Sequence, residues 1–291
     1  LLHFKHYQVE VMILEVGMGG RLDATNIIDP DLSIITTIDF DHQAFLGETR
    51  DQIGFEKAGI LRKGKPFIYA DTSPPQSILL NAIILGCPSY INAKHYTFQF
   101  DDETFIFSFG HKTLRLPKLA WHPNAIAAAL MATVCLEKRL PVDNNVRTQG
   151  LQFITLSGRQ HYLTTPIATL LDVSHNAQSV AYLAATLGQC QTDNRRVHAV
   201  FSAVSDKDFD ALVCPLLKYV NQWYPALLNG KRAASEAQLQ AVFRKYDIMP
   251  EAFHNSPLEA YQAACQKASL GDLIVVYGSF LTVGEVLTAL N

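Results

Sequence analysis

From residue 151 onward, short apolar runs alternate with segments of helical length and pattern, and this alternation restricts the fold more than any other feature of the chain. The strand-like runs are residues 167–173, 197–203, 223–227 and 273–277. The helix-like segments are residues 177–187, 209–220, 235–246, 256–268 and the stretch that ends at residue 290. Strands joined by helical crossovers pair in parallel, with helices on both faces of the sheet. Residues 151–291 are therefore predicted to form a doubly wound α/β domain.

The first half of the chain opens with an apolar run, residues 9–14, that has the length and composition of an inner parallel strand. The run ends at Glu15, and the glycines that follow permit backbone conformations and close contacts that a Cβ atom would block. A second run, residues 32–40, is followed by Asp41 and His42. Ligands of open α/β sheets bind beyond the carboxyl ends of the strands, so we expect Glu15, Asp41 and His42 at one edge.

These three side chains suit a hard cation. Mg²⁺ takes one or two protein ligands and leaves its other positions to water and phosphate oxygens. Taken alone, Glu15 is explained equally well by a salt bridge and His42 by a structural role, and imidazole is the less usual ligand of Mg²⁺. The residues by themselves therefore leave the metal site open.

Local sequence patterns predict the other elements of residues 1–150, which we expect to form an α/β domain with a β-hairpin. Thr49 and Gln52 have the spacing of a capping box and open a helix that carries Lys57. Aromatic residues alternate with polar ones over residues 96–100 and 105–109, which predicts the hairpin. Pro123 begins an alanine-rich helix, and the polar stretch 142–150 is the best candidate for a linker.

The glycines after Glu15 also suggest a dinucleotide-binding loop, because Asp39 lies about 20 residues further on. A G-x-G-x-x-G motif that starts at Gly17 would need a glycine at position 22, which is Leu22. The spacing therefore disfavours a nicotinamide cofactor.

The second half repeats the arrangement of the first. Asp172, His175 and Asn176 follow an apolar strand and lead into a helix, whose N-terminus suits a phosphate or a nucleotide hydroxyl. The alternative, in which Asn176 is only a helix cap, is equally acceptable. Arg159 stands beside a glycine near the predicted linker, where a guanidinium could contact phosphates. Residues 205–208 and 278–280 also fall at strand ends.

Composition excludes several classes of partner. The formal net charge is −3 and the chain has no long Lys/Arg block, which argues against nucleic acid and anionic membranes and favours small molecules. The five cysteines form no metal-binding spacing and indicate reduced thiols in a cytoplasmic protein. Because residue 1 is Leu and a central strand is predicted within a few residues of it, we expect the chain to be part of a longer protein.

In this order, the segments resemble the folylpolyglutamate synthase and dihydrofolate synthase family of Mur-type ATP-dependent ligases. The segments that carry the resemblance are residues 13–26, 41–47, 53–60, 122–130, 156–160, 171–176, 205–208 and 278–280. The resemblance implies a P-loop-type domain like the central domain of Mur ligases, truncated here and spanning residues 1–150, followed by a Rossmann-like domain over residues 151–291. It also implies a monomer that uses ATP and Mg²⁺.

The resemblance also implies a role for individual residues. Glu15 and His42 match Mg²⁺ ligands, and Lys57 matches a lysine that is carbamylated, which would give it negative charge toward the metal. For the nucleotide, the matching residues are Asn124 at the adenine, Asp172 at the ribose, and Arg159 and His175 at the phosphates. For the substrates, Asp23 and Ala24 lie in the pterin-binding loop, and Ser279 lies in the segment at the glutamate end.

The implied reaction uses ATP to convert the carboxylate of dihydropteroate or a folate into an acyl phosphate, which the amine of L-glutamate attacks. Two alternatives stay open. One is a noncatalytic remnant that binds nucleotide or folate, and the other is a peptidoglycan amide ligase of the Mur type, which residues 19–25 disfavour because they look specific to the folate branch.

The chain departs from the family pattern in one large respect, since no GKS or GKT phosphate loop occurs in its 291 residues. A phosphate loop supplies several backbone donors and a lysine, and the loss of a single such donor costs roughly 10² to 10³ in rate. Residues 1–291 alone are therefore predicted to have no measurable synthase activity. ADP release by the purified chain that depends on both glutamate and a folate would contradict this prediction.

Overall fold

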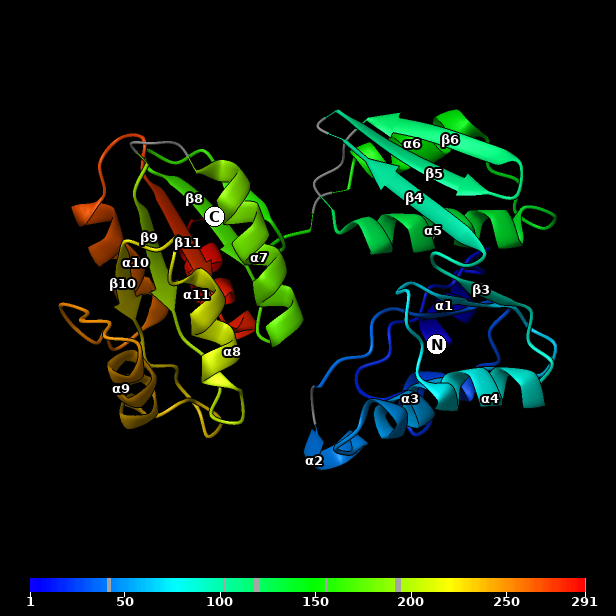
Figure 1. The fold of residues 1–291 in the computed structure, drawn as a ribbon, viewed down its shortest axis with the longest axis horizontal. Helices are drawn as coiled ribbons and strands as arrows, with labels where there is room; N and C mark the ends of the chain where they lie inside the picture. The colour runs from blue at the N-terminus through cyan, green and yellow to red at the C-terminus, as the bar shows by residue number, and fades with distance from the viewer. Residues whose placement is uncertain (41–42, 102, 118–120, 155, 192–194, 291) are drawn as a thin grey trace. The chain divides into compact units, whose positions relative to one another are not determined.

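The computed structural model describes residues 1–40, 43–101, 103–117, 121–154, 156–191 and 195–290. The chain divides into two compact units, Leu1–Ile154 and Thr155–Asn291 (Figure 1). This boundary lies four residues beyond the one predicted from the sequence, which is between residues 150 and 151. Each unit has its own buried cores and is described by itself.

A parallel sheet forms the centre of the first unit, in the order β1 (Ser33–Ile35), β2 (Phe67–Tyr69) and β3 (Ser89–Ile91). Successive side chains of a strand point to opposite faces of its sheet. In β2, Phe67 and Tyr69 pack against α3 (Arg50–Ala58) and α4 (Gln76–Ile84), whereas Ile68 packs into the core on the other side. All three side chains of β2 are fully buried, so the sheet is covered on both faces.

The second core of this unit lies between α5 (Pro123–Leu136), α6 (Asn144–Gln152) and an antiparallel sheet (Figure 1). The sheet consists of β4 (Tyr96–Phe100), β5 (Thr104–Phe109) and β6 (Lys112–Pro117). The predicted hairpin is therefore confirmed, but its third strand, β6, was not predicted. The Phe98 and Phe105 rings stack with centroids 5.4 Å apart, which accounts for the aromatic alternation as packing.

The predicted strand over residues 9–14 is wrong. These residues have no strand conformation and follow a short helix, α1 (Leu2–His6); Val11 and Ile13 are 51% and 88% exposed. A strand is stabilised by hydrogen bonds to a neighbouring strand, and within the described residues β1 pairs only with β2. Apolar composition does not produce a strand where no ladder partner is present. Two further short helices, η1 (Ala24–Ile27) and α2 (Gln43–Leu46), complete the unit.

The predicted linker over residues 142–150 is also wrong, because this stretch forms most of α6. The Asp143 carboxylate caps the helix by accepting a hydrogen bond from the Val146 N–H at 2.9 Å. Arg147 Nε donates to Thr133 Oγ1 of α5 at 2.9 Å, and Leu151 is buried in the core. Because the exposed face of α6 is polar, its composition resembles that of a linker. Only the helix cap and the buried contacts distinguish α6 from a linker.

The second unit contains a five-stranded sheet with β11 (Leu273–Tyr277) at its centre. Its order is β10 (Gln222–Pro225), β9 (Val197–Phe201), β11, β8 (Ala168–Asp172) and β7 (His161–Leu163). The first four strands are parallel, and β7 is antiparallel to β8. The predicted α/β fold is confirmed, and the edge strand β7 is an addition to the prediction.

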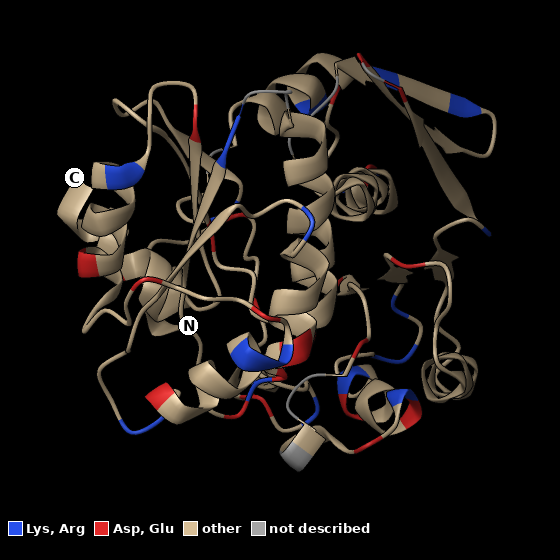
Figure 2. Ribbon diagram, turned by 60° about the vertical axis from the view of Figure 1, so that its left-hand side comes forward, with Lys and Arg blue, Asp and Glu red and all other residues tan. Residues whose placement is uncertain are grey.

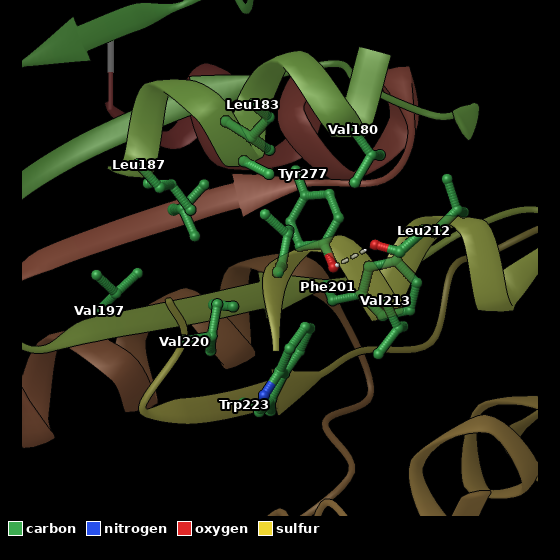
Figure 3. Packing of buried hydrophobic residues seen from close by; sticks show 14 of the residues in the cluster. Val180, Leu183, Leu187, Val197, Phe201, Leu212, Val213, Val220, Trp223 and Tyr277 are labelled. Atoms are coloured by element: carbon green, nitrogen blue, oxygen red, sulfur yellow. Dashed lines mark hydrogen bonds between the residues drawn. The ribbon is translucent and has the colours of Figure 1, made fainter. Parts of the chain in front are cut away.

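Helices cover both faces of this sheet (Figure 1). One face packs against α7 (Ala177–Cys190), α8 (Phe209–Val213), η2 (Cys214–Leu216) and α9 (Glu236–Lys245), and the other against α10 (Pro257–Lys267) and α11 (Phe280–Leu290). Figure 3 shows the first of these cores, in which the Tyr277 hydroxyl donates to the Leu212 carbonyl oxygen at 3.1 Å. Burial raises the pKa of this hydroxyl well above its ordinary value, so Tyr277 acts as a neutral donor.

The predicted capping box of Thr49 with Gln52 is confirmed, and Ser235 with Gln238 forms a second one. Ser256 caps α10 by accepting from the Glu259 N–H, but the Glu259 carboxylate accepts from the Asn255 N–H at 3.1 Å. The cap of α10 is therefore not a reciprocal capping box.

Charges of both signs are mixed along the two units, as Figure 2 shows. The five cysteines are free thiols. Within the described ranges, no helix has both the length and the apolar character that a membrane crossing requires.

Gly278 gives a test of the packing around the central strand. Its φ is +106°, and a Cβ atom there would lie 2.2 Å from the Ser202 carbonyl oxygen. The Gly278→Ala substitution should therefore lower the stability of the protein by about 1–3 kcal/mol or more. Gly284→Ala is the matched control, because Gly284 lies within α11 with nothing inside 4 Å of an added Cβ, and should stabilise by up to about 1 kcal/mol. Urea midpoints followed by circular dichroism measure both, and equal midpoints for the two variants would contradict the packing.

Candidate active site

The parallel register of the second unit brings three strand ends to one edge. Asp172 of β8 and Phe201 of β9 both pair with Tyr277, the last residue of β11. The segments that follow these strands therefore lie beside one another, as the Gly278 N–H confirms by donating to the Ser174 carbonyl oxygen at 3.0 Å. This is the edge at which open α/β sheets bind ligands.

Asp172 organises the loops at this edge through its carboxylate. One oxygen accepts from the backbone N–H and from the side-chain Nε2 of Gln160, each at 2.9 Å. The other accepts from the Ser174 N–H at 2.9 Å and from the Ser174 hydroxyl. Asp172 is only 7% exposed, so its carboxylate is largely removed from water. The four donors supply the hydrogen bonds that water would otherwise make.

His175 lies at the entrance to α7. Its Nδ1 is 2.8 Å from the Val173 carbonyl oxygen, and its backbone N–H donates to Ser179 Oγ at 3.1 Å. Asn176 caps the helix in a capping box with Ser179, as the sequence allowed. The imidazole is therefore held in place at a helix N-terminus, which favours anions through its dipole and its exposed N–H groups.

Phe280 connects His175 to Arg159. The Phe280 ring centroid lies 5.5 Å from that of His175 and 5.7 Å from the centre of the Arg159 guanidinium. Both contacts place a polar side chain against an aromatic ring, and the face of the ring attracts the positive charge of the Arg159 guanidinium. The guanidinium and the imidazole are thus gathered on one exposed ring at the carboxyl edge of the sheet.

Backbone geometry sets the position of Arg159. It lies between Gly158 at φ +74° and Gln160 at φ +46°, two residues in the left-handed region. A Cβ on Gly158 would lie 3.0 Å from Val283 Cγ1, so the turn packs closely on α11. Ser279 directly precedes α11 and is 7% exposed. Its hydroxyl oxygen accepts a hydrogen bond from the Leu281 N–H at 3.1 Å.

In the first unit, the loop of residues 17–27 packs against the end of α3. Added Cβ atoms on Gly20 and Gly59 would lie 2.9 Å from Ile60 and 2.4 Å from Arg21, so both glycines are required by the close approach. Arg21 also forms a two-point ion pair with Glu56, with contacts of 3.1 and 2.9 Å. Lys57, which is half-buried, follows Glu56 in the last turn of this helix.

Asp23 has within its loop the same role that Asp172 has in the second unit. Its carboxylate accepts from the N–H groups of Gly17 at 3.0 Å and Thr25 at 2.8 Å, and from the Thr25 hydroxyl at 2.6 Å. The hydrogen bond from the Thr25 side chain is the main cause that lowers the pKa of Asp23. The carboxylate holds the loop in shape, and Ala24 begins the short helix η1 that Asp23 caps.

Asn124 lies at the carboxyl edge of the first unit's parallel sheet, as the second residue of α5. Its N–H donates to Nδ1 of His122, the N-cap, at 3.3 Å. Its Oδ1 accepts from Asn92 Nδ2 at 3.4 Å. The sequence did not single out Asn92, because an asparagine after a short apolar run has no distinctive spacing.

Of the predicted metal ligands Glu15 and His42, only Glu15 lies within the described residues. Glu15 is exposed and belongs to no strand, and His42 lies outside the described residues, as does Asp41. No group of three or more His, Cys, Asp or Glu side chains suited to a metal occurs among the residues that the structure describes.

Comparison with known proteins covers nearly the whole chain. A model of the glutamate ligase domain of Mur ligases matches residues 158–280. The dihydrofolate synthase/folylpolyglutamate synthase of Escherichia coli K12 is 34% identical over 291 residues, covering 99% of this chain and 67% of that protein. The protein of the same name from Haemophilus influenzae is 33% identical, covering 97% of this chain and 68% of its own length.

The chain belongs to the folylpolyglutamate synthase and dihydrofolate synthase family.

Two solved structures of this synthase family agree with the fold. E. coli FolC in complex with DHPP and ADP superimposes with a TM-score of 0.91 at 34% identity, covering 99% of this chain and 68% of that one. A bifunctional folylpolyglutamate synthase/dihydrofolate synthase with Mn, AMPPNP and L-glutamate bound gives 0.88 at 37% identity, covering 99% and 69%. The resemblance found in the sequence and the predicted fold class are confirmed, and the family is one of ATP-dependent ligases.

For this synthase-family chain, the pH dependence of stability tests the geometry at Asn124. The pKa of His122 lies below its ordinary value of 6.5, chiefly because burial disfavours the imidazolium, while Asp71 opposes the shift. Between the lowered value and about 6.5 the unfolded chain binds more protons than the folded one, so stability falls as the pH falls through this window. Protonated Nδ1 would also lose its hydrogen bond to Asn124.

The His122→Asn variant keeps a capping acceptor but removes the titration, so its stability should fall less between pH 7 and 5 than that of the wild type. Urea denaturation at a series of pH values measures the difference. Contributions of other histidines cancel because they are present in both proteins, and identical slopes would contradict the proposed cap.

Proposed function

We propose that this chain serves, together with a phosphate loop that its 291 residues lack, in the ATP-dependent addition of L-glutamate to dihydropteroate, to a folate, or to both. The observation that carries the proposal is the placement of Arg159 and His175 on the Phe280 ring, next to the capped N-terminus of α7. A guanidinium, an imidazole and helix N–H groups together suit phosphate oxygens. Membership of the synthase family supports ATP as one of the phosphate compounds, and we propose an acyl phosphate as the other.

The reaction has two displacement steps. A carboxylate oxygen of the pterin substrate attacks the γ-phosphorus of ATP, and ADP leaves with the electrons of the broken bond. The amine of L-glutamate then attacks the acyl carbon, and phosphate leaves as the amide forms. Arg159 and His175 would stabilise the negative charge that collects on the phosphate oxygens in both steps.

Two residues are proposed for the recognition of the nucleotide. We propose Asn124 for the adenine and Asp172 for the ribose. All four acceptor positions of Asp172 are engaged, so a ribose hydroxyl would take the place of the flexible Gln160 side chain and leave the backbone donors unchanged.

For the metal we propose Mg²⁺ with Glu15 and His42 as ligands and Lys57 as a carbamate. The exposed Glu15 carboxylate fits, because Mg²⁺ needs only one or two protein ligands and prefers oxygen. When bound, Mg²⁺ would neutralise charge on the ATP phosphates. A carbamate would let Lys57 face that charge without repulsion, because it replaces an ammonium with an anion.

Substrate binding is proposed for two segments. The loop that contains Asp23 and Ala24 would contact the pterin. The Asp23 carboxylate already accepts hydrogen bonds from Gly17 and Thr25, so it would hold the loop in shape while other atoms of the loop contact the pterin. Ser279 would lie at the glutamate end of the site. We also propose that the protein acts as a cytoplasmic monomer, as the resemblance to the synthase family implies.

An ADP-release assay on the complete gene product tests the function. Activity is expected only when ATP, L-glutamate and either dihydropteroate or a reduced folate are all present, with nucleotide-linked muramyl peptides inactive. Arg159→Ala should lower kcat/KM by about 10² or more, as expected for the loss of a group that stabilises transferred phosphate. Lys57→Arg should abolish turnover, since a guanidinium forms no carbamate.

Arg115→Ala is the control, because Arg115 lies on β6 in the antiparallel sheet of the first unit, outside both sites. It should leave kcat/KM unchanged. Turnover of the muramyl peptides, or full activity in Arg159→Ala, would contradict the proposal. A dimer mass measured by light scattering would contradict the proposal that the protein is a monomer.

A further inference from the structure

We propose that Asn92 is a positioning residue that fixes the orientation of the Asn124 amide and so determines the hydrogen-bonding pattern presented to the base of the nucleotide. The inference rests on the proposed function, in which Asn124 contacts adenine. Asn92 directly follows β3 and is 3% exposed. A buried amide at the carboxyl edge of a parallel sheet needs partners for all of its polar atoms, and those partners define what it can do.

Backbone contacts fix which end of the Asn92 amide is oxygen. Asn92 Oδ1 accepts from the Ala93 N–H at 2.8 Å, and Asn92 Nδ2 donates to the Ala70 carbonyl oxygen at 3.0 Å. Exchange of the two ends would place oxygen against oxygen and nitrogen against N–H. The orientation of Asn92 is therefore set by the backbone and not by its side-chain neighbours.

The sheet register explains why these groups meet. Ile91 of β3 pairs with Tyr69 of β2, so the residues one step further along, Asn92 and Ala70, lie together at the carboxyl edge. The Asn92 N–H donates to the Tyr69 carbonyl oxygen at 3.1 Å, which extends the ladder by one bond. Ala93 has φ +62°, and its bond to Asn92 Oδ1 compensates for that strained conformation.

The orientation is passed on to Asn124. The second N–H of Asn92 Nδ2 points to Asn124 and needs an acceptor, so the atom 3.4 Å away must be Asn124 Oδ1. Asn124 Nδ2 is then on the opposite side of its amide. The backbone of Asn124 is fixed as well, through its hydrogen bond to the His122 cap.

This order of donor and acceptor is complementary to adenine. Asparagine pairs with adenine by donating from Nδ2 to N7 and accepting at Oδ1 from N6. Oδ1 has two lone pairs, so it can accept from Asn92 and from the base at once. A reversed amide would set donor against donor and acceptor against acceptor, so Asn92 excludes the unproductive orientation.

The test uses Asn92→Asp in the complete gene product. Aspartate has the same shape and still accepts from Ala93, but it donates neither to Asn124 nor to the Ala70 carbonyl oxygen, and it would attract Asn124 Nδ2, which reverses the Asn124 amide. Calorimetry with ADP should show binding weakened about tenfold, which corresponds to about 1.4 kcal/mol. Binding of inorganic tripolyphosphate, which has no base, should change less than twofold.

Two further variants separate positioning from general damage. Asn92→Ser is uncharged and also lacks a donor that reaches Asn124, so it should reproduce the loss of ADP affinity if the aspartate variant does not fold. Asn221→Asp, in which the Asn221 Oδ1 acceptor for the Val197 N–H is retained, is the matched control in the second unit and should leave ADP binding unchanged.

A double-mutant cycle with Asn124→Ala decides the outcome. If Asn92 acts through Asn124, Asn92→Asp should have no added effect on ADP binding once Asn124 is alanine. Equal losses in both backgrounds, or equal losses for ADP and tripolyphosphate, would overturn the inference. If Asn124→Ala weakens ADP binding and the Asn92 variants do not, only the inference fails. If Asn124→Ala itself has no effect, the adenine role in the proposed function fails and takes the inference with it.

Discussion

The close contact between Gly278 and the Ser202 carbonyl oxygen determines how the second unit can present a ligand site. No side chain fits at position 278, and the left-handed φ turns the chain directly from β11 into α11. Phe280 begins that helix, and its ring is where the Arg159 guanidinium and the His175 imidazole meet. The three groups come from three separate segments, so their proximity depends on the register of β8 and β11 and on this tight turn.

In both units an aspartate carboxylate holds a loop in shape. Asp23 and Asp172 were both singled out by the sequence as ligand-contacting residues, and in the structure both carboxylates accept hydrogen bonds from nearby backbone N–H groups and a hydroxyl. A loop with such an internal acceptor is ordered before any ligand arrives, which reduces the entropy lost on binding. A residue type that suits ligand binding is therefore equally suited to building the loop that binds.

The sequence predicted most of the second unit because strand and helix patterns alternate there and each strand finds parallel neighbours within the unit. It failed at residues 9–14, where apolar composition favours a strand but no neighbouring ladder forms, and at α6, whose polar surface resembles a linker. It missed β7 because three residues with one apolar side chain carry no detectable alternation. At the candidate site, Asp172 and His175 were predicted from their position after a strand, Arg159 from its place beside a glycine, and all three from the resemblance, whereas Asn92 depends on a register that only the folded sheet defines.

The edge strand β7 affects how the protein tolerates amino-acid substitutions at this side of the sheet. It covers the edge of β8 and is itself a very short edge strand, which limits pairing with other chains. The same strand follows directly after the Arg159 turn, and Gln160, its neighbour, donates to Asp172. Substitutions that loosen this edge would therefore increase aggregation and disturb the proposed phosphate contacts together, so solubility and the proposed activity would depend on the same margin of the sheet.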